Sequence, residues 1–303
     1  MIEIQNLTKR YGEKVAVDDV SFTVRPGVVT GFLGPNGAGK STTMRAVVGL
    51  DRPTSGTAHV DGRPYRELRD PLRRVGALLE AKAVHKGRSA FDHLSALAAT
   101  HRIPAARVHE VIGMTGLENV AKKRVGGFSL GMGQRLGIAA ALLGDPQTLI
   151  LDEPVNGLDP EGVVWVRRLA RSLAAEGRAV FISSHLMSEM ALTADRIVVM
   201  GRGRVLADTD IADLVAAATE RSVTVRTPEP ERLLDAIAGP DVTIGYEGDG
   251  SLQVRGLGAE QIGEAAGAAG IVLHQLATTE ASLEQAYLEL THDQVEYRSE
   301  VAR

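Results

Sequence analysis

Apolar and polar residues alternate along the chain with two different periods. Residues 1–30 alternate in short runs, which is typical of antiparallel strands and hairpins. Residues 28–33 form a continuous apolar run that ends at Gly34, and this predicts a buried central strand feeding a loop. A helix is expected to follow over residues 40–49, so the chain opens with strands and then passes into a strand–loop–helix unit.

Three later apolar runs predict further buried strands, with helical sequence before and between them. The expected strands lie at 149–151, 179–183 and 197–200. Residues ~90 to ~143 are rich in alanine at helical spacing, with breaks at Pro104 and at Gly126-Gly127. Strands that alternate with helices imply a mostly parallel α/β sheet.

The pattern changes after about residue 220, where short strands and helices alternate over smaller spacings. The expected elements are a strand at 223–225, a helix at 229–238 and a strand at 271–276. We therefore expect two domains, a large α/β domain at 1–220 and a small α+β domain at 221–303.

Composition and charge narrow the classes of function. The net charge is −4, from 34 basic and 38 acidic residues among 303, which argues against non-specific nucleic-acid binding and leads us to expect no nucleic-acid partner. The sequence has no cysteine, which excludes thiolate metal sites and cysteine nucleophiles. It shows neither a signal-peptide pattern nor an apolar run of ~18 residues, so any membrane role is expected to require a partner protein.

A glycine-rich segment between the expected strand and helix matches the pattern G-x-x-x-x-G-K-[ST] of a phosphate-binding loop. Glycines let backbone N–H groups close around a triphosphate, and the following helix presents its positive end. Lys40 is expected to reach the β- and γ-phosphates, and the Ser41 hydroxyl to bind Mg²⁺. The expected ATP contacts here are Gly34, Pro35, Asn36, Gly37, Ala38, Gly39, Lys40, Ser41 and Thr42. The loop alone also fits a kinase, a GTPase or a motor.

Two acids follow the expected strand at 149–151. The carboxyl ends of parallel strands are where ligands bind in such sheets. Asp152 is expected to support Mg²⁺, which leaves Glu153 to act as general base on the attacking water. Because many phosphate-loop proteins lack a second acid, the pair favours ATP hydrolysis over simple nucleotide binding.

Residues 128–135, Phe-Ser-Leu-Gly-Met-Gly-Gln-Arg, resemble the signature motif of ABC ATPases, and the resemblance covers most of residues 1–215. Leu130 and Met132 replace the usual glycine and glutamine, while Ser129 and Gly131 are kept. The resemblance implies a P-loop NTPase fold of the ABC type, with antiparallel β and α-helical subdomains, the latter at about 85–145. It also implies that Ser129 and Gly131 bind the γ-phosphate of ATP held by the opposite subunit.

The resemblance assigns roles to three further residues. Asp159, in Asn156-Gly157-Leu158-Asp159, resembles the loop that crosses the dimer interface, although a plain turn would explain it alone. His185 resembles the histidine that links the γ-phosphate, the attacking water and Glu153. Tyr11 lies where the family places an aromatic ring that stacks on adenine.

Glu80 stands where the family usually has a glutamine that touches Mg²⁺. A glutamate is a stronger Mg²⁺ ligand, but it adds charge and cannot donate a hydrogen bond. The alternative is a surface acid outside the site. With the signature variant, Glu80 resembles the subgroup that exports bacitracin, lantibiotics and other drugs.

The resemblance implies an ATP- and Mg²⁺-dependent ATPase that drives drug or antibiotic export through a separate permease. One chain carries one phosphate loop and one signature, so a head-to-tail homodimer is implied, peripheral at the inner face of the membrane. The alternatives are a translation or repair ABC ATPase, against which the single ATPase unit and the lack of coiled-coil heptads argue, and a small-molecule kinase, against which the signature and His185 argue.

Overall fold

The computed structural model describes residues 1–80, 84–217, 222–246, 250–279 and 283–291. It divides into two compact units, Met1–Ile211 and Ala212–Leu290. The domain boundary expected near residue 220 lies outside the described residues, so it stays a prediction. No helix in the described part of the chain is both long and apolar enough to cross a membrane.

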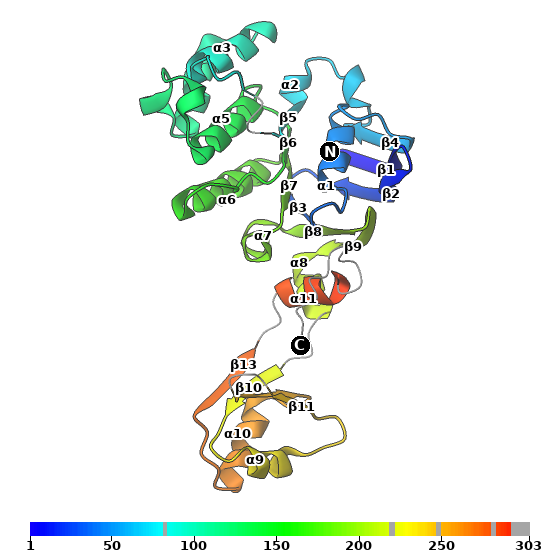
Figure 1. Cartoon of the computed structure of the whole chain (residues 1–303), viewed down its shortest axis with the longest axis vertical. Helices are drawn as coiled ribbons and strands as arrows, with labels where there is room; N and C mark the ends of the chain where they lie inside the picture. The colour runs from blue at the N-terminus through cyan, green and yellow to red at the C-terminus, as the bar shows by residue number, and fades with distance from the viewer. Residues whose placement is uncertain (81–83, 218–221, 247–249, 280–282, 292–303) are drawn as a thin grey trace. The chain divides into compact units, whose positions relative to one another are not determined.

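A six-stranded sheet forms the centre of the first unit, in the order β5-β6-β7-β3-β8-β9 (Figure 1). Its strands are β3 (Val29–Leu33), β5 (Val75–Leu78), β6 (Thr148–Leu151), β7 (Ala179–Ser184), β8 (Arg196–Gly201) and β9 (Arg204–Asp210). The strands run parallel except at the β8–β9 pair. Every residue of β3, β6 and β7 is buried, because both faces of the sheet are covered. The predicted buried strands and the α/β fold class are confirmed.

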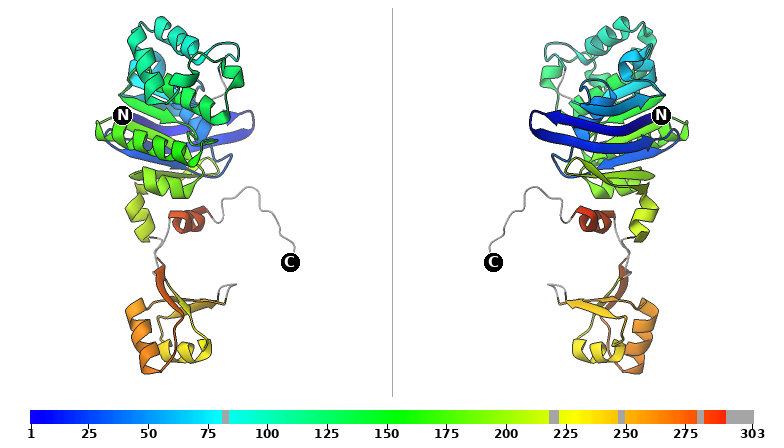
Figure 2. Two further views of the ribbon diagram at one scale, coloured as in Figure 1. Left: turned by 90° about the vertical axis from the view of Figure 1, so that its left-hand side faces the viewer. Right: turned by 90° about the vertical axis from the view of Figure 1, so that its right-hand side faces the viewer.

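A three-stranded antiparallel sheet packs over one face of the central sheet. It consists of β2, β1 and β4, at Lys14–Val24, Ile2–Tyr11 and Ser55–Val60. Figure 2 shows α6 in front in one view and the β1–β2 pair in front in the opposite view, so the two lie on opposite faces. Phe22 packs against Phe32 and Phe181, with ring centroids 5.0–5.6 Å apart among the three. Burial of each ring contributes about 1.5–3 kcal/mol to the stability of the folded unit.

The helices of the first unit lie around the central six-stranded sheet. They are α1 (Lys40–Val47), α2 (Pro71–Arg74), α3 (Ala90–Thr100), α4 (Ala105–Met114), α5 (Leu130–Leu142), α6 (Pro160–Ala175) and α7 (Met187–Thr193), with short 3₁₀ turns at Tyr65–Glu67, Glu118–Val120 and Val125–Gly127. The helical region predicted at 90–143 is confirmed as α3 to α5, which pack together beside β5 (Figure 1). Ser89, Ser129 and Asp159 begin α3, α5 and α6, since each side chain accepts a hydrogen bond from a backbone N–H three residues on.

The second unit contains a four-stranded antiparallel sheet in the order β11-β12-β10-β13. Its elements are β10 (Ser222–Arg226), α9 (Pro230–Ile237), β11 (Thr243–Tyr246), β12 (Leu252–Arg255), α10 (Ala259–Ala268) and β13 (Gln275–Thr279), flanked by α8 (Ile211–Ala217) and α11 (Leu283–Thr291). Leu233 and Ile237 of α9 and Ile262 and Ala266 of α10 form one core with the inward residues of β10 and β12. This is an α+β unit, as predicted.

The strand predicted at 271–276 is wrong in its limits. Gly270 has a φ of +64° at the end of α10, and β13 begins only at Gln275. Ile271 is nevertheless 7% exposed, because it packs into the core of the unit directly after the helix. Ile271 is therefore apolar because it follows the buried face of α10. In the sequence, such an apolar residue after a helix cannot be told from the start of a strand.

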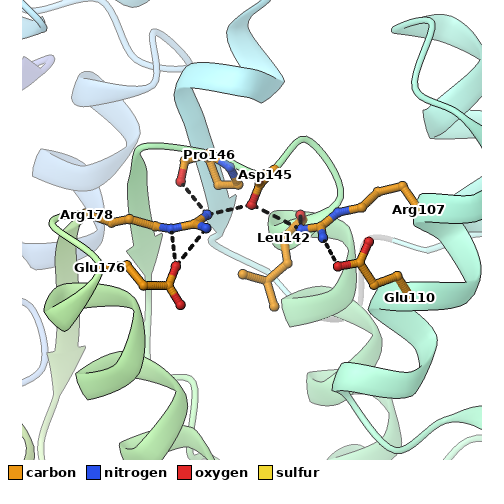
Figure 3. Close-up of polar contacts among 7 residues, drawn as sticks. All are labelled: Arg107, Glu110, Leu142, Asp145, Pro146, Glu176 and Arg178. Atoms are coloured by element: carbon orange, nitrogen blue, oxygen red, sulfur yellow. Dashed lines mark hydrogen bonds and ion pairs between the residues drawn. The ribbon is translucent and has the colours of Figure 1, made fainter.

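A chain of ion pairs fastens the helical region to the central sheet (Figure 3). Asp145 lies between α5 and β6, and its Oδ1 is 2.7 Å from Arg178 Nη1 and 3.4 Å from Arg107 Nη2. Arg107, on α4, also pairs with Glu110 and donates to the carbonyl of Leu142. The hydrogen bond from Arg178 is the main cause that lowers the pKa of Asp145. The cluster thus joins α4, the end of α5 and the segment before β7.

We predict that Arg178→Met lowers the melting temperature of the first unit by several degrees at pH 7. The change removes three contacts of a side chain that is 16% exposed, which corresponds to about 1–3 kcal/mol. Because the folded-state pKa of Asp145 is lowered, its contribution is complete above about pH 4 and is lost as the pH falls through the folded pKa. Calorimetry across pH checks both effects. The exposed Arg66 is the control, and an equal loss in Arg66→Met would contradict the assignment.

Candidate functional site

A cavity of ≈ 370 Å³ opens at the carboxyl ends of β3 and β6. This is the edge of a parallel sheet at which ligands bind. The residues around it come from three regions, namely the β1–β2 turn, the loop and start of α1, and the end of β6. They are Tyr11, Lys14, Ala16, Asn36, Gly37, Ala38, Gly39, Lys40, Ser41, Thr42, Asp152 and Glu153.

The loop between β3 and α1 has a conformation that requires glycine at Gly39. Its φ is +102°, and a Cβ there would lie 2.5 Å from the carbonyl oxygen of Ala16 on β2. A side chain would therefore be strained and would collide with backbone. The close approach holds the loop against the antiparallel sheet, with the start of α1 facing the cavity.

Lys40 is the most buried charged residue of the cavity wall, with 6% of its surface exposed. Its Nζ donates hydrogen bonds to the carbonyl oxygens of Gly34, at 2.6 Å, and Pro35, at 3.3 Å. Burial lowers the pKa of Lys40, while the charges of Glu153 and Asp152 act in the opposite direction. Gly34 and Pro35 thus hold the ammonium group inside the loop, although neither lines the cavity.

Asp152 and Glu153 are held by one serine at the end of β7. Ser183 Oγ donates to Asp152 Oδ1 at 2.5 Å and accepts from the backbone N–H of Glu153 at 2.9 Å. This serine is fully buried. Because β6 and β7 are paired in parallel, the serine lies beside the two acids and fixes their orientation.

His185 contacts Glu153 directly. Its Nδ1 lies 2.7 Å from Glu153 Oε2, and the histidine side chain is 49% exposed while that of the glutamate is 21% exposed. His185 is not itself among the residues that line the cavity, so its ring is connected to the cavity through Glu153. The contact predicted between these two side chains is present in the structure.

Tyr11 lines the cavity, and the residue is 47% exposed. Its hydroxyl donates to Asp51 at 2.9 Å, and the Nζ of Lys9 lies 4.8 Å from the ring centroid. Partial burial, followed by the hydrogen bond to Asp51, raises the pKa of Tyr11. The ring is thus fixed at the wall of the cavity, where it can stack on a planar base.

Ser129, Gly131 and Asp159 do not line this cavity. Ser129 is an exposed N-cap, and Asp159 accepts from the backbone N–H of Gly162 at 2.8 Å. A Cβ added at Gly131 would lie 3.0 Å from the carbonyl oxygen of Gly157, so the two segments are neighbours. The start of α5 and the loop before α6 therefore form one surface, separate from the cavity of the same chain.

The remaining candidate, Glu80, is exposed and is absent from the cavity wall. It lies two residues past β5 and close enough to Arg45 to raise the pKa of that guanidinium, a lesser effect than that of Asp51. Within the described residues no group of three or more acidic, histidine or cysteine side chains could hold a metal alone. Ser41 and Asp152 nevertheless offer hydroxyl and carboxylate oxygens on one cavity, a set that fits Mg²⁺ completed by phosphate and water.

Several contacts of the site were not predicted from the sequence. Ser183 and Asp51 each orient a predicted residue, and Lys14 lines the cavity. Gln134, on α5, donates to the carbonyl oxygen of Glu153 at 2.9 Å. A serine at the end of an otherwise apolar strand is a visible signal, whereas the other contacts depend on how distant segments meet.

Two family models match the chain. One, described as ABC transporter, matches residues 17–156, and the other, described as a domain of unknown function, matches residues 221–284. Over 211 residues the chain is 43% identical to the bacitracin transport ATP-binding protein BcrA of Bacillus licheniformis, with 68% of each chain covered. It is 39% identical over 206 residues to the lantibiotic transport ATP-binding protein SrtF of Streptococcus pyogenes, covering 68% of this chain and 89% of that one.

Solved structures with the same fold agree with these relatives. The chain aligns with an ATP-binding subunit of an ABC transporter at a TM-score of 0.66 and 26% identity, covering 72% of this chain and 92% of that one. It also aligns with a dimeric ATP-binding cassette in a post-hydrolysis state, bound to ADP and Pi, at a TM-score of 0.64 and 25% identity. That match covers 69% of this chain and 98% of the other.

We predict that Gly39→Ala strongly weakens nucleotide binding, although the variant keeps Lys40. The added methyl group would meet the Ala16 carbonyl at 2.5 Å in a backbone conformation that favours glycine. Titration with a fluorescent ATP analogue should show at least about a 100-fold loss of affinity, equal to about 2.8 kcal/mol. Gly267→Ala is the matched control, because a Cβ on that α10 residue meets nothing within 4 Å. Unchanged affinity in Gly39→Ala would show that the loop does not hold the nucleotide.

Proposed function

The chain belongs to the ATP-binding proteins of ABC transporters, and we propose that its cavity binds Mg-ATP and hydrolyses it to drive export through a separate membrane permease. As a member of this family it is an ATPase. The observation that carries the site assignment is the grouping of Lys40, Asp152 and Glu153 on one cavity, with His185 bonded to Glu153.

In this proposal the triphosphate lies on the loop before α1. Backbone N–H groups of residues 36–42 and the start of α1 surround the phosphates, and Lys40 leaves the loop carbonyls to contact the β- and γ-phosphates. The adenine stacks on Tyr11 at the wall of the cavity. Ser41 and Asp152 would hold Mg²⁺, which neutralises charge on the phosphates when bound. Glu80 is proposed as a further Mg²⁺ contact, although it is exposed in this structure.

Hydrolysis in this proposal depends on Glu153 as general base. Its carboxylate accepts a proton from the water that attacks the γ-phosphorus, while the bond to the β–γ bridging oxygen breaks. His185 holds one carboxylate oxygen, and Ser183 holds both the backbone of Glu153 and the neighbouring Asp152. A base fixed in this way needs little reorganisation before the proton moves.

We further propose that two copies assemble head to tail around two ATP molecules. Ser129, Gly131 and Asp159 lie outside the cavity of their own chain, on a surface that is exposed at Ser129 and Asp159. The backbone N–H groups at the start of α5 and the serine hydroxyl suit a γ-phosphate, which a second chain would present. The dimeric cassette among the similar structures supports assembly as a dimer.

The transported substrate is proposed from the relatives, since the ATPase itself does not contact it. BcrA and SrtF serve bacitracin and lantibiotic transport, which supports export of an antibiotic or similar amphiphile. The chain would then lie at the inner face of the cell membrane, attached to its permease. Closing of the ATP-bound dimer and its reopening after hydrolysis would shift the permease between its two conformations.

We predict that Glu153→Gln lowers ATP turnover by about 10²- to 10⁴-fold and keeps ATP binding, because the amide cannot accept the proton from water. Light scattering after gel filtration with Mg-ATP should then show a trapped dimer. Glu67→Gln, at an exposed position away from the cavity, is the matched control and should retain turnover. Normal turnover in Glu153→Gln would contradict the general-base role.

A further inference from the structure

Glu153 has a backbone conformation that side chains from two other elements hold in place. Its φ is +50°, in the left-handed region that residues other than glycine adopt at a cost of about 1–2 kcal/mol. Ser183 accepts from its N–H at 2.9 Å, and Gln134 Nε2 donates to its carbonyl oxygen at 2.9 Å. The peptide groups on both sides of the strained residue are therefore anchored.

Gln134 differs from Ser183 because it belongs to the helix that begins at Ser129. Only 6% of the surface of Gln134 is exposed, whereas Ser129, at the start of α5, is exposed. The two residues are five positions apart, which places them about 140° apart around the helix. One helix therefore presents an exposed end to the surface and an inner side chain to Glu153.

We propose that Gln134 is a positioning residue that couples the start of α5 to Glu153 of the same subunit. This inference rests on the proposed function, in which Ser129 caps the ATP of the partner subunit. An α-helix moves as a rigid element, so a shift of its first turn onto that ATP displaces Gln134 as well. The hydrogen bond transmits the shift to the carbonyl of Glu153. The carboxylate is then aligned for catalysis only when the first turn of α5 contacts the ATP of the partner subunit.

This coupling makes each subunit's general base depend on nucleotide in the other subunit's phosphate loop. The path consists of two contacts and one helix, from the partner's γ-phosphate through Ser129 and α5 to Gln134 and Glu153. Gln134 is not among the residues that line the cavity, so its loss should affect alignment of the base and leave ATP binding intact.

The test compares Gln134→Met, which keeps the length and burial of the side chain but cannot donate, with Trp165→Phe. Trp165 Nε1 also donates one hydrogen bond to the backbone carbonyl of another helix, at 3.2 Å to Met114 and not to Glu153. We expect kcat to fall about 10- to 100-fold in Gln134→Met with KM for ATP within about twofold. Trp165→Phe should keep its kcat. Gln134→Asn, which keeps a shorter amide, should retain part of the activity and also serves if the methionine variant does not fold.

A second measurement separates this inference from the proposed function. In the Glu153→Gln background Gln134→Met should cause no further loss of residual turnover, because both changes act on the same base. A kcat for Gln134→Met equal to that of Trp165→Phe, or an unchanged kcat with raised KM, would overturn the coupling while the role of Glu153 stands. If Glu153→Gln itself keeps its turnover, the proposed function fails first.

Discussion

The site depends on keeping one ammonium group and two carboxylates together at a largely buried sheet edge. Lys40 loses most of its hydration there, and burial alone would favour its neutral form. Carbonyl oxygens of its own loop and the charges of Asp152 and Glu153 offset this penalty. An anionic ligand that enters the cavity replaces those carbonyls with stronger, charge-assisted partners. Lys40 is thus already in position to bind a phosphate group before any nucleotide is present.

Most of the central fold could be predicted from the sequence because its signals are local. The continuous apolar runs of β3, β6 and β7 are buried on both faces, and such strands show no alternation that could mislead. The phosphate loop was predictable for the same reason, since its residues are consecutive in the chain and match one motif, in which Gly39 is required by a φ of +102°. The strand limits after Gly270 were wrong because an apolar residue that ends a helix core looks the same in sequence as one that starts a strand.

The contacts that orient the site could not be predicted, because they join segments far apart in the chain. Ser183 reaches Glu153 only through the parallel pairing of β6 with β7, and Gln134 only through the packing of α5 beside β5 and β6. The positive φ of Glu153 leaves no trace in composition or periodicity. Asp145 and its two arginines likewise become a cluster only when the helical region meets the sheet. Sequence motifs therefore identify the reacting groups, while tertiary packing decides how they are held.

In the proposed assembly, one chain binds the nucleotide and a second chain completes its site. Because the sequence has no cysteine, single-cysteine variants can test it without background reaction. Two chains, one carrying Asn36→Cys and the other Ser129→Cys, would be mixed in the Glu153→Gln background and treated with a short bifunctional cross-linker. We predict a 36–129 cross-link between chains that forms with Mg-ATP and not without it. A 36–129 cross-link that forms equally well without nucleotide, or none in the presence of Mg-ATP, would contradict this arrangement.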